Sequence, residues 1–505
     1  MRADGPQQPG TVLLLHSNDL HSRLEQAAKF SAYIAEARNR YGADRLLVLD
    51  AGDHMDRMRK ETEGTGGRVN IELLNEAAFD AVTLGNNEGL SWTMDALDEL
   101  YGGHAHFPVV CANMIRESDG GRPSWMKPAV FVEKGGITFG ITGVTAAFRD
   151  FYIELGWRML DPVEAAAEQV RRLRPQADIV IVLSHLGLPM DRRLAEEIEG
   201  IDLILGGHTH HLLEEPLVIG ETVILATGKF GDYLGRVEID RRADGRGFAF
   251  RASVVPMAEA AERPEAAGVI ARGLAEAEAA LSRVEAVLAA PLEAFDDRES
   301  PLPNLLAAAI RRHTGAEIGL VNAGQILGGL PAGGVTTGRL HAICPSPINP
   351  CRMTLTGRHI RQALEEALLA EWIERPIRGF GFRGERLGTL AVDGLRIVYD
   401  PDGPPFGKLR EVTAGTEPLR DDRLYTVGTI DMFTFGIGYE SLKLGTDIRL
   451  YLPEFIRDVL AAELADAASV EEAHRIRWFA RSGGAHLHGM PPGQYNENRF
   501  KQNIQ

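Results

Sequence analysis

An apolar run leads directly into potential metal ligands in the stretch Leu15-His16-Ser17-Asn18-Asp19-Leu20-His21. Four more stretches repeat the arrangement: Ala51-Gly52-Asp53, Gly85-Asn86-Asn87-Glu88, Ser184-His185 and Gly206-Gly207-His208-Thr209-His210. Each follows a largely apolar segment typical of a buried strand, at 12–15, 46–49, 81–84, 179–183 and 203–205. Ligands bind at the carboxyl ends of strands in open α/β sheets, so all five stretches can meet at one point. The sequence therefore predicts an α/β fold with a metal centre at a sheet edge.

Seven residues form the predicted ligand set: Asp19, His21, Asp53, Asn86, His185, His208 and His210. The set mixes carboxylate, amide and imidazole groups, which suit Mn²⁺, Zn²⁺, Co²⁺ or Fe²⁺ better than Mg²⁺ or Ca²⁺. Asp53 follows a turn that Gly52 permits, and a carboxylate there can bridge two cations. Each residue alone also fits a loop, turn or helix-cap role, so the prediction depends on the combination.

The composition excludes several classes of partner. The chain has 505 residues, and 71 Asp and Glu against 54 Lys and Arg give a net charge of −17, which disfavours a large surface for nucleic acid or an anionic membrane. Residues 1–10 are polar and no run approaches a membrane span, so we expect a cytoplasmic protein without a membrane partner. Cys344 and Cys351 could pair in an oxidising compartment, but free thiols are the preferred interpretation.

The pattern along the chain predicts two α/β domains. Residues 1–257 alternate strand-like runs with helical patterns at 24–41, 93–101, 162–173 and 190–199. Residues 258–290 are rich in Ala and Glu and predict a helical linker, either a hinge or a rigid packed helix. A second α/β unit covers 291–481, with helices at 304–314 and 358–370 and a strand at 318–322. Residues 482–505 are expected to form a surface tail without chemistry.

The five stretches, in this order, resemble the 5′-nucleotidase family of calcineurin-like metallophosphoesterases, in a bacterial branch without a signal peptide. That family includes periplasmic UDP-sugar hydrolases and 2′,3′-cyclic-nucleotide phosphodiesterases. The second half resembles the family's nucleotide-specificity domain in the stretches Val321-Asn322-Ala323-Gly324, Gly334-Val335-Thr336, Thr354-Leu355-Thr356-Gly357, Val392-Asp393-Gly394-Leu395 and Tyr425-Thr426-Val427. The resemblance implies a four-layered α/β/β/α catalytic domain, a second α/β domain and two divalent ions.

The resemblance also implies how the ligands divide between the ions. The first ion would be held by Asp19, His21, Asp53 and His210, and the second by Asp53, Asn86, His185 and His208. The implied activity is hydrolysis of nucleotides or related small-molecule phosphate esters. The sequence leaves the oligomeric state open.

One departure from the family concerns proton donation. The family's G-N-H-E block places a histidine after the metal-binding asparagine and an aspartate three residues further on, but these positions are Asn87 and Leu90 here. Groups of this kind contribute about 10²–10⁴-fold to the rate. We therefore expect slow hydrolysis of alkyl phosphates, or a substitute for the missing pair.

A second departure concerns the substrate. The family's N-x-G-G-I-R block keeps Asn322 and Gly324 but ends in Leu327, and the L-P-F block ends in Ser346. Asn322 and Gly324 are the predicted substrate contacts, together with Tyr439. The ring of Tyr439 either stacks on a base or belongs to the core.

His54 is the candidate substitute acid and, with Asn87, completes the predicted catalytic set. It follows Asp53 in Asp53-His54-Met55-Asp56-Arg57, where Asp56 could fix its tautomer and Arg57 could add charge. The alternative is an exposed loop residue.

Two other functions stay open. A pyrophosphatase acting on nucleotide sugars or dinucleotides needs less proton donation to its leaving group. A catalytically weakened nucleotide-binding regulatory protein would also explain Asn87 and Leu327.

Overall fold

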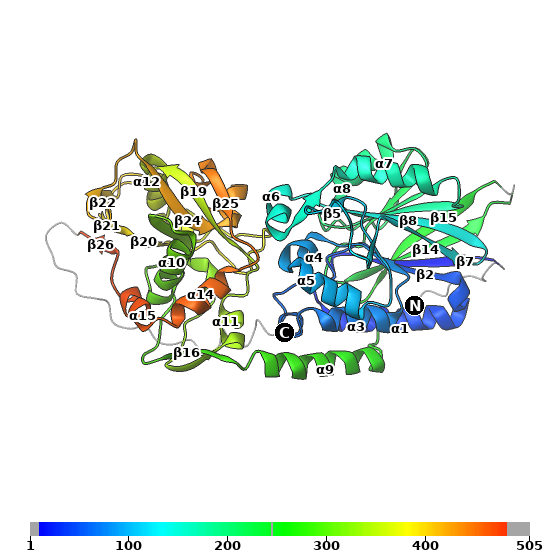
Figure 1. The fold of residues 1–505 in the computed structure, drawn as a ribbon, viewed down its shortest axis with the longest axis horizontal. Helices are drawn as coiled ribbons and strands as arrows, with labels where there is room; N and C mark the ends of the chain where they lie inside the picture. Colours follow the sequence, from blue (N-terminus) through cyan, green and yellow to red (C-terminus); the bar gives the residue numbers. More distant parts are fainter. Residues whose placement is uncertain (1–9, 244–245, 482–505) are drawn as a thin grey trace.

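The computed structural model describes residues 10–243 and 246–481, so the predicted tail at 482–505 lies outside the described residues. Two α/β domains lie side by side, and helix α9 (Pro264–Ala280) runs along one edge of the N-terminal domain before the chain enters the C-terminal domain (Figure 1). Among the helices of the described ranges, none is long and apolar enough to cross a membrane. Cys344 and Cys351 are buried free thiols, as predicted.

The N-terminal domain is built on two sheets that pack face to face. The first has seven strands in the order β15-β14-β1-β2-β3-β4-β6, and the second has six in the order β12-β13-β11-β10-β8-β7. Their bounds are Val12–Ser17 (β1), Leu46–Asp50 (β2), Ala81–Val82 (β3), Val109–Val110 (β4), Met126–Lys127 (β6), Ala129–Lys134 (β7), Ile137–Thr145 (β8), Ile179–His185 (β10), Leu203–Gly206 (β11), Leu217–Ile219 (β12), Thr222–Leu225 (β13), Tyr233–Arg241 (β14) and Phe248–Pro256 (β15).

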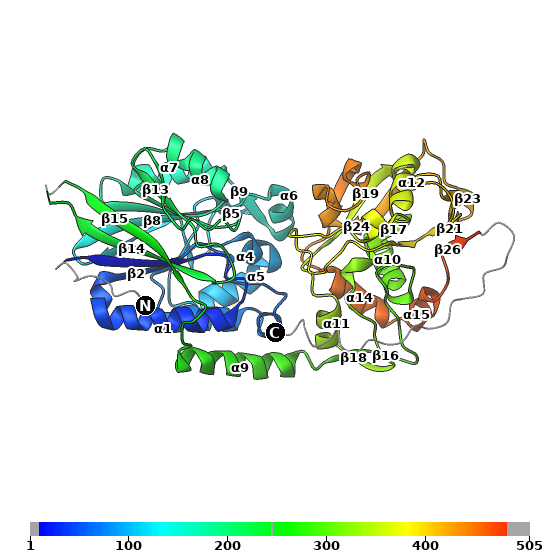
Figure 2. The ribbon, with the colours of Figure 1, turned by 180° about the vertical axis from the view of Figure 1, so that it is seen from behind.

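Helices cover the outer face of each sheet (Figure 2). The helices and the remaining strands of this domain are Leu24–Tyr41 (α1), Lys60–Gly64 (α2), Arg68–Ala77 (α3), Asn86–Ser91 (α4), Met94–Leu97 (α5), Arg149–Tyr152 (α6), Pro162–Leu173 (α7), Leu188–Glu197 (α8), Met114–Arg116 (β5) and Trp157–Met159 (β9). Along β1, Leu13 and Leu15 pack with α1, whereas Leu14 packs with the second sheet. Strands buried on both faces explain the continuous apolar runs, and the four layers confirm the predicted α/β/β/α architecture.

The linker differs from its prediction. Within 258–290, which the structure describes throughout, the helix ends at Ala280 and Val284–Leu288 forms strand β16, which pairs with β18 (Gly333–Thr336) of the C-terminal domain. Helix α9 packs on α2 and α3, and a side-chain carbon at Gly64 would lie 2.5 Å from the Cα of Ala277. The helix is therefore packed on the N-terminal domain rather than free, which favours the rigid alternative.

The C-terminal domain contains a five-stranded sheet, β20-β17-β24-β19-β25, and a four-stranded sheet, β23-β22-β21-β26. Its strands are Ile318–Asn322 (β17), Pro350–Thr356 (β19), Leu390–Asp393 (β20), Leu395–Tyr399 (β21), Leu409–Ala414 (β22), Glu417–Pro418 (β23), Leu424–Ile430 (β24), Thr446–Leu450 (β25) and Trp478–Ala480 (β26). Its helices are Pro301–Thr314 (α10), Thr337–Ile343 (α11), Gly357–Glu366 (α12), Ala370–Ile373 (α13), Ile456–Leu464 (α14) and Ala467–Ala473 (α15).

The close contact of α2 with α9 gives a stability prediction. Gly64→Ala forces a methyl group against the backbone of Ala277 and should lower the free energy of unfolding by about 1–3 kcal/mol. The matched control is Gly268→Ala on α9, where the nearest atom is 3.6 Å away, and this change should stabilise by up to about 1 kcal/mol. Denaturant unfolding checks both values. Equal effects of the two variants would contradict tight packing of α9.

Candidate metal centre

The loops that follow β1 and β2 are joined by backbone hydrogen bonds. The amide of Asp19 donates to the carbonyl of Gly52 at 2.9 Å, and the amide of His21 donates to the carbonyl of Asp53 at 2.9 Å. In the parallel pair β1–β2, Ser17 lies opposite Asp50, so both loops leave the sheet at the same level. The two predicted carboxylate ligands are thereby placed next to each other.

The backbone is strained at most of the predicted ligands. Positive φ angles occur at eleven non-glycine residues of the described chain, and five of these are Asp19, His21, Asp53, His208 and His210. Such conformations cost roughly 1–3 kcal/mol each and concentrate at functional sites. The fold therefore loses some stability by holding these side chains in the direction of the centre.

Asp19, His21 and His210 form one group of converging ligand atoms. The Oδ1 atom of Asp19 is 3.7 Å from Nε2 of His21 and 3.4 Å from Nε2 of His210, and the two Nε2 atoms are 3.2 Å apart. Atoms bound tetrahedrally to one ion at about 2.1 Å lie roughly 3.4 Å from each other. These three side chains have the spacing of a shared metal ion.

His185 joins Asp19 and Asp53 in a second group. Its Nδ1 atom is 2.8 Å from the carbonyl of Ala51, which turns Nε2 toward Oδ2 of Asp53 at 3.4 Å. This Nε2 atom is buried and has no hydrogen-bond partner among the described residues. An orphaned imidazole nitrogen beside two carboxylates fits a metal ligand.

Asn86 and His208 complete the predicted ligand set. The Oδ1 atom of Asn86 lies 2.8 Å from Nδ1 of His208, and the ring of His208 lies 5.3 Å from that of His185. The structure thus brings all seven predicted ligands to one place. Asp19 belongs to both groups, and Oδ2 of Asp53 lies 3.4 Å from Nε2 of His185 and 3.9 Å from Nε2 of His21.

The negative charge of the buried carboxylates in the centre favours binding of a cation. Burial opposes charge on His21, yet Asp19, Asp56 and Asp53 raise its pKa to about 10. Burial likewise opposes charge on His185, but Asp53 and Asp19 raise its pKa to about 10. The carboxylates draw protons onto the imidazoles, and a divalent metal would supply the same positive charge. The donor set therefore fits divalent metal ions.

Glu88, which was not singled out from the sequence, holds the backbone next to the candidate ligands. Its Oε2 atom accepts hydrogen bonds from the amides of Asp53 at 3.0 Å and Gly85 at 2.8 Å, and Oε1 accepts one from Met55 at 2.8 Å. Burial raises the pKa of this carboxyl to about 7. Glu88 fixes the loop that carries Asp53.

The two predicted catalytic residues have different surroundings. The Nδ2 atom of Asn87 donates to the carbonyl of Met55 at 3.1 Å and lies 3.0 Å from Nδ1 of His21. The predicted pairing of His54 with Asp56 is wrong. Nδ1 of His54 faces Asn70, and burial lowers the pKa of His54 to about 3.

Asp56 and Arg57, the two residues expected to assist His54, make their contacts with other residues. The Oδ2 atom of Asp56 faces His21 and Arg383. Arg57 forms two hydrogen bonds to Glu63, at 2.7 and 2.9 Å, and its guanidinium lies over the ring of Phe455. Neither residue is placed to assist His54.

The predicted substrate contacts lie inside the C-terminal domain. Asn322 donates to the carbonyl of Leu387 at 2.8 Å, and a side chain at Gly324 would collide with the backbone of the same segment. Tyr439 is fully buried and its hydroxyl donates to the carbonyl of Gly388 at 2.8 Å. The structure places Tyr439 in the core, so its ring has no open face for a base.

Four aromatic rings, two of them exposed, border the candidate metal centre instead. Phe435 is 42% exposed and stacks on Phe151 of the N-terminal domain with ring centroids 5.6 Å apart and planes 13° apart. Phe380, which is 49% exposed, lies 5.6 Å from Phe435, and Phe148 lies 6.0 Å from His208. We call these four residues the aromatic cluster. Sequence reasoning missed it because exposure at a domain interface has no local signature.

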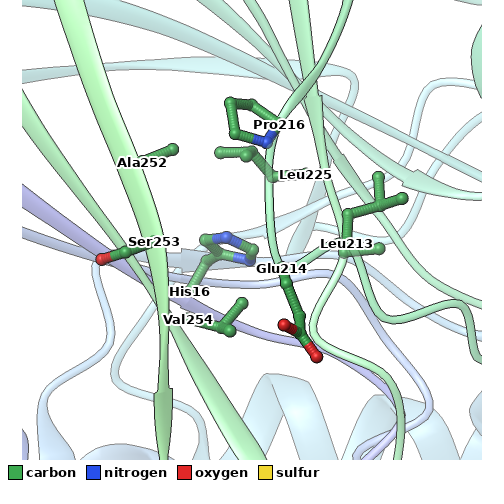
Figure 3. A pocket seen from close by; sticks show the side chains of 9 residues that line it. His16, Leu213, Glu214, Pro216, Leu225, Ala252, Ser253 and Val254 are labelled. Atoms are coloured by element: carbon green, nitrogen blue, oxygen red, sulfur yellow. The ribbon is translucent and has the colours of Figure 1, made fainter.

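His16 belongs to the first motif but not to the centre. It extends from β1 into a crevice lined by Leu213, Pro216 and Ser253, too small for a water molecule (Figure 3). Its cross-strand partner is Gly235, where any side chain would collide with the imidazole. His16 is a core residue.

Comparisons with known proteins agree with this geometry. Residues 12–212 match the calcineurin-like phosphoesterase family, and residues 282–443 match the 5′-nucleotidase C-terminal domain. An uncharacterized metallophosphoesterase of Bacillus subtilis (strain 168), YunD, is 37% identical over 90% of this chain and 98% of its own. A 5′-nucleotidase precursor from Thermus thermophilus has a similar structure, with a TM-score of 0.57 and 25% identity over 90% of this chain and 96% of that one.

The Haemophilus influenzae NAD nucleotidase shares the fold, with a TM-score of 0.67 and 18% identity over 94% of this chain and 99% of that one. The calcineurin-like family uses divalent metals, and this chain carries the residues to hold them. The chain belongs to the 5′-nucleotidase family of calcineurin-like metallophosphoesterases, which are metal-dependent hydrolases of phosphate esters.

Proposed function

We propose that this enzyme hydrolyses nucleotides with two divalent transition-metal ions held by the seven converging ligands. The convergence itself carries the proposal, above all the orphaned Nε2 of His185 beside Asp53 and Asp19. Asp53 would be a ligand of both ions. When bound, such ions lower the pKa of water toward about 7 and stabilise the charge that develops on the phosphoryl group.

The chain's own residues set the geometry of the reaction. Glu88 holds the backbone at Asp53, and the carbonyl of Ala51 holds the ring of His185. Asn87 is engaged with Met55 and His21 and cannot donate a proton to an alkoxide. Departure of the leaving group therefore receives little acid assistance from this position.

The aromatic cluster supports a nucleotide as the substrate. A base is a flat apolar ring, and stacking on aromatic side chains contributes about 1–3 kcal/mol per base. Phe380 and Phe435 come from the C-terminal domain, while Phe148 connects the cluster to His208. A phosphate at the metals would then have its base at the cluster.

A pyrophosphatase acting on nucleotide sugars or dinucleotides is the second candidate. The observation in its favour is the position of Asn87. Asn87 cannot act as an acid, and a phosphate leaving group departs without one. The cytoplasmic location remains a prediction from the sequence.

The bridging role of Asp53 can be tested by substitution. Asp53→Ala should reduce the metal content below the roughly two ions per chain expected for the wild type and should abolish hydrolysis, because neither ion keeps its full ligand set. Elemental analysis and turnover of p-nitrophenyl phosphate measure the two effects. Asp44→Ala, an exposed control, should change neither. Wild-type turnover in Asp53→Ala, or active protein without transition metal, would refute the metal centre.

The position of Asn87 predicts a steep dependence on the leaving group. Across aryl and alkyl phosphates, kcat/KM should fall strongly as the pKa of the leaving group rises. Asn87→His should raise kcat/KM for alkyl esters selectively, by up to about 10². If kcat/KM does not change with the pKa of the leaving group, another group already donates the proton.

The aromatic cluster predicts base recognition. Phe435→Ala should raise KM for a mononucleotide about tenfold, because one stacking surface is lost, and should leave ribose 5-phosphate, which has no base, almost unchanged. Phe131→Ala, an exposed phenylalanine on β7, is the control and should affect neither substrate. Equal losses on both substrates would argue against a base at the cluster.

A further inference from the structure

Arg383 of the C-terminal domain reaches the metal centre of the N-terminal domain through Asp56. Its Nη2 atom lies 2.6 Å from Oδ2 of Asp56, and the same oxygen lies 3.5 Å from Nδ1 of His21. The side chain of Asp56 is 5% exposed and that of Arg383 is 19% exposed. A buried carboxylate in such a pair depends on its partner, because removing one charge leaves the other uncompensated.

The Asp56 carboxylate is fixed on its other side by the loop that carries the ligands. Its Oδ1 atom accepts a hydrogen bond from the amide of Met58 at 2.9 Å. The amide of Asp56 donates to Oγ of Ser22 at 2.7 Å, and Ser22 directly follows His21. Asp56 therefore has a defined orientation relative to the His21 ring.

His21 needs an acceptor at Nδ1 if it is to bind a metal through Nε2. A neutral imidazole that ligates through one nitrogen carries its proton on the other, and the partner of that proton sets the ring orientation. Asn87 offers its Nδ2 atom at 3.0 Å, but this amide nitrogen already donates to the carbonyl of Met55 and is not an acceptor. Asp56 is the acceptor within reach.

We propose that Arg383 is a positioning residue of the metal centre. It holds the carboxylate of Asp56 where that group receives the Nδ1 proton of His21, so the C-terminal domain contributes to the metal affinity of the N-terminal domain. This inference rests on the proposed metal centre and extends it across the domain interface. The backbone of Arg383 is itself held, since its amide donates to Oγ of Ser346 at 3.2 Å.

Metal affinity without substrate tests the inference. Calorimetric titration of the metal-free full chain with Mn²⁺ should show about 10–100-fold weaker binding of one ion in Arg383→Gln, the range for loss of an outer-shell partner. Arg383→Lys keeps a cation beside Asp56 and should stay within about threefold of the wild type. Circular dichroism of each metal-free variant verifies that it is folded.

Arg457→Gln is the matched control. Arg457 also makes a buried ion pair across the domain interface, with Glu63 at 2.8 Å, but neither residue of this pair faces a predicted metal ligand, whereas Asp56 faces His21. Its Mn²⁺ affinity should match the wild type. Unchanged affinity in Arg383→Gln, or an equal loss in Arg457→Gln, would overturn the inference.

The two proposals can fail separately. A wild-type chain that binds no Mn²⁺ would overturn both. Weakened binding specific to Arg383→Gln would support the role of Arg383 even if no tested ester is hydrolysed. Normal hydrolysis with unchanged metal affinity in Arg383→Gln would overturn only this inference.

Discussion

The backbone hydrogen bonds between the loops after β1 and β2 are the constraint on which the rest of the centre depends. They place Asp19 beside Asp53 and hold both residues in left-handed conformations that an isolated chain would avoid. Two carboxylates forced together in the interior repel each other unless positive charge lies between them. The raised pKa of His185 follows from that concentration of negative charge.

The convergence of the seven candidate ligands was predictable from the sequence, whereas the position of the aromatic cluster was not. Strand ends are visible as the points where apolar runs stop, and parallel strands bring those ends to one edge, so His185 and His208 could be assigned without coordinates. Helix α7 formed over its predicted residues because Asp161 caps it and Pro162 begins it. These signals are local in the chain.

The misassigned residues depended on contacts between distant segments. His54 directly follows Asp53, but its ring turns toward Asn70 because the loop folds over α3. Tyr439 and Phe435 are four positions apart, and only the packing of the C-terminal domain decides that the first is in the core and the second at the interface. Periodicity does not encode which of two aromatic residues faces a neighbouring domain.

The centre has a consequence for synthesis of the protein on the ribosome. The rings of His21 and His210 meet in the centre although the two residues are 189 positions apart in the sequence. Strand β1 also pairs with β14, which follows His210 in the sequence. At roughly 5–20 residues per second, a nascent chain exposes its first ligands for about 10–40 s before the last ones appear. During that interval Asp19 and His21 lack His210, so this group of candidate ligands is incomplete. The group is complete only after the N-terminal domain has closed around all of its strands.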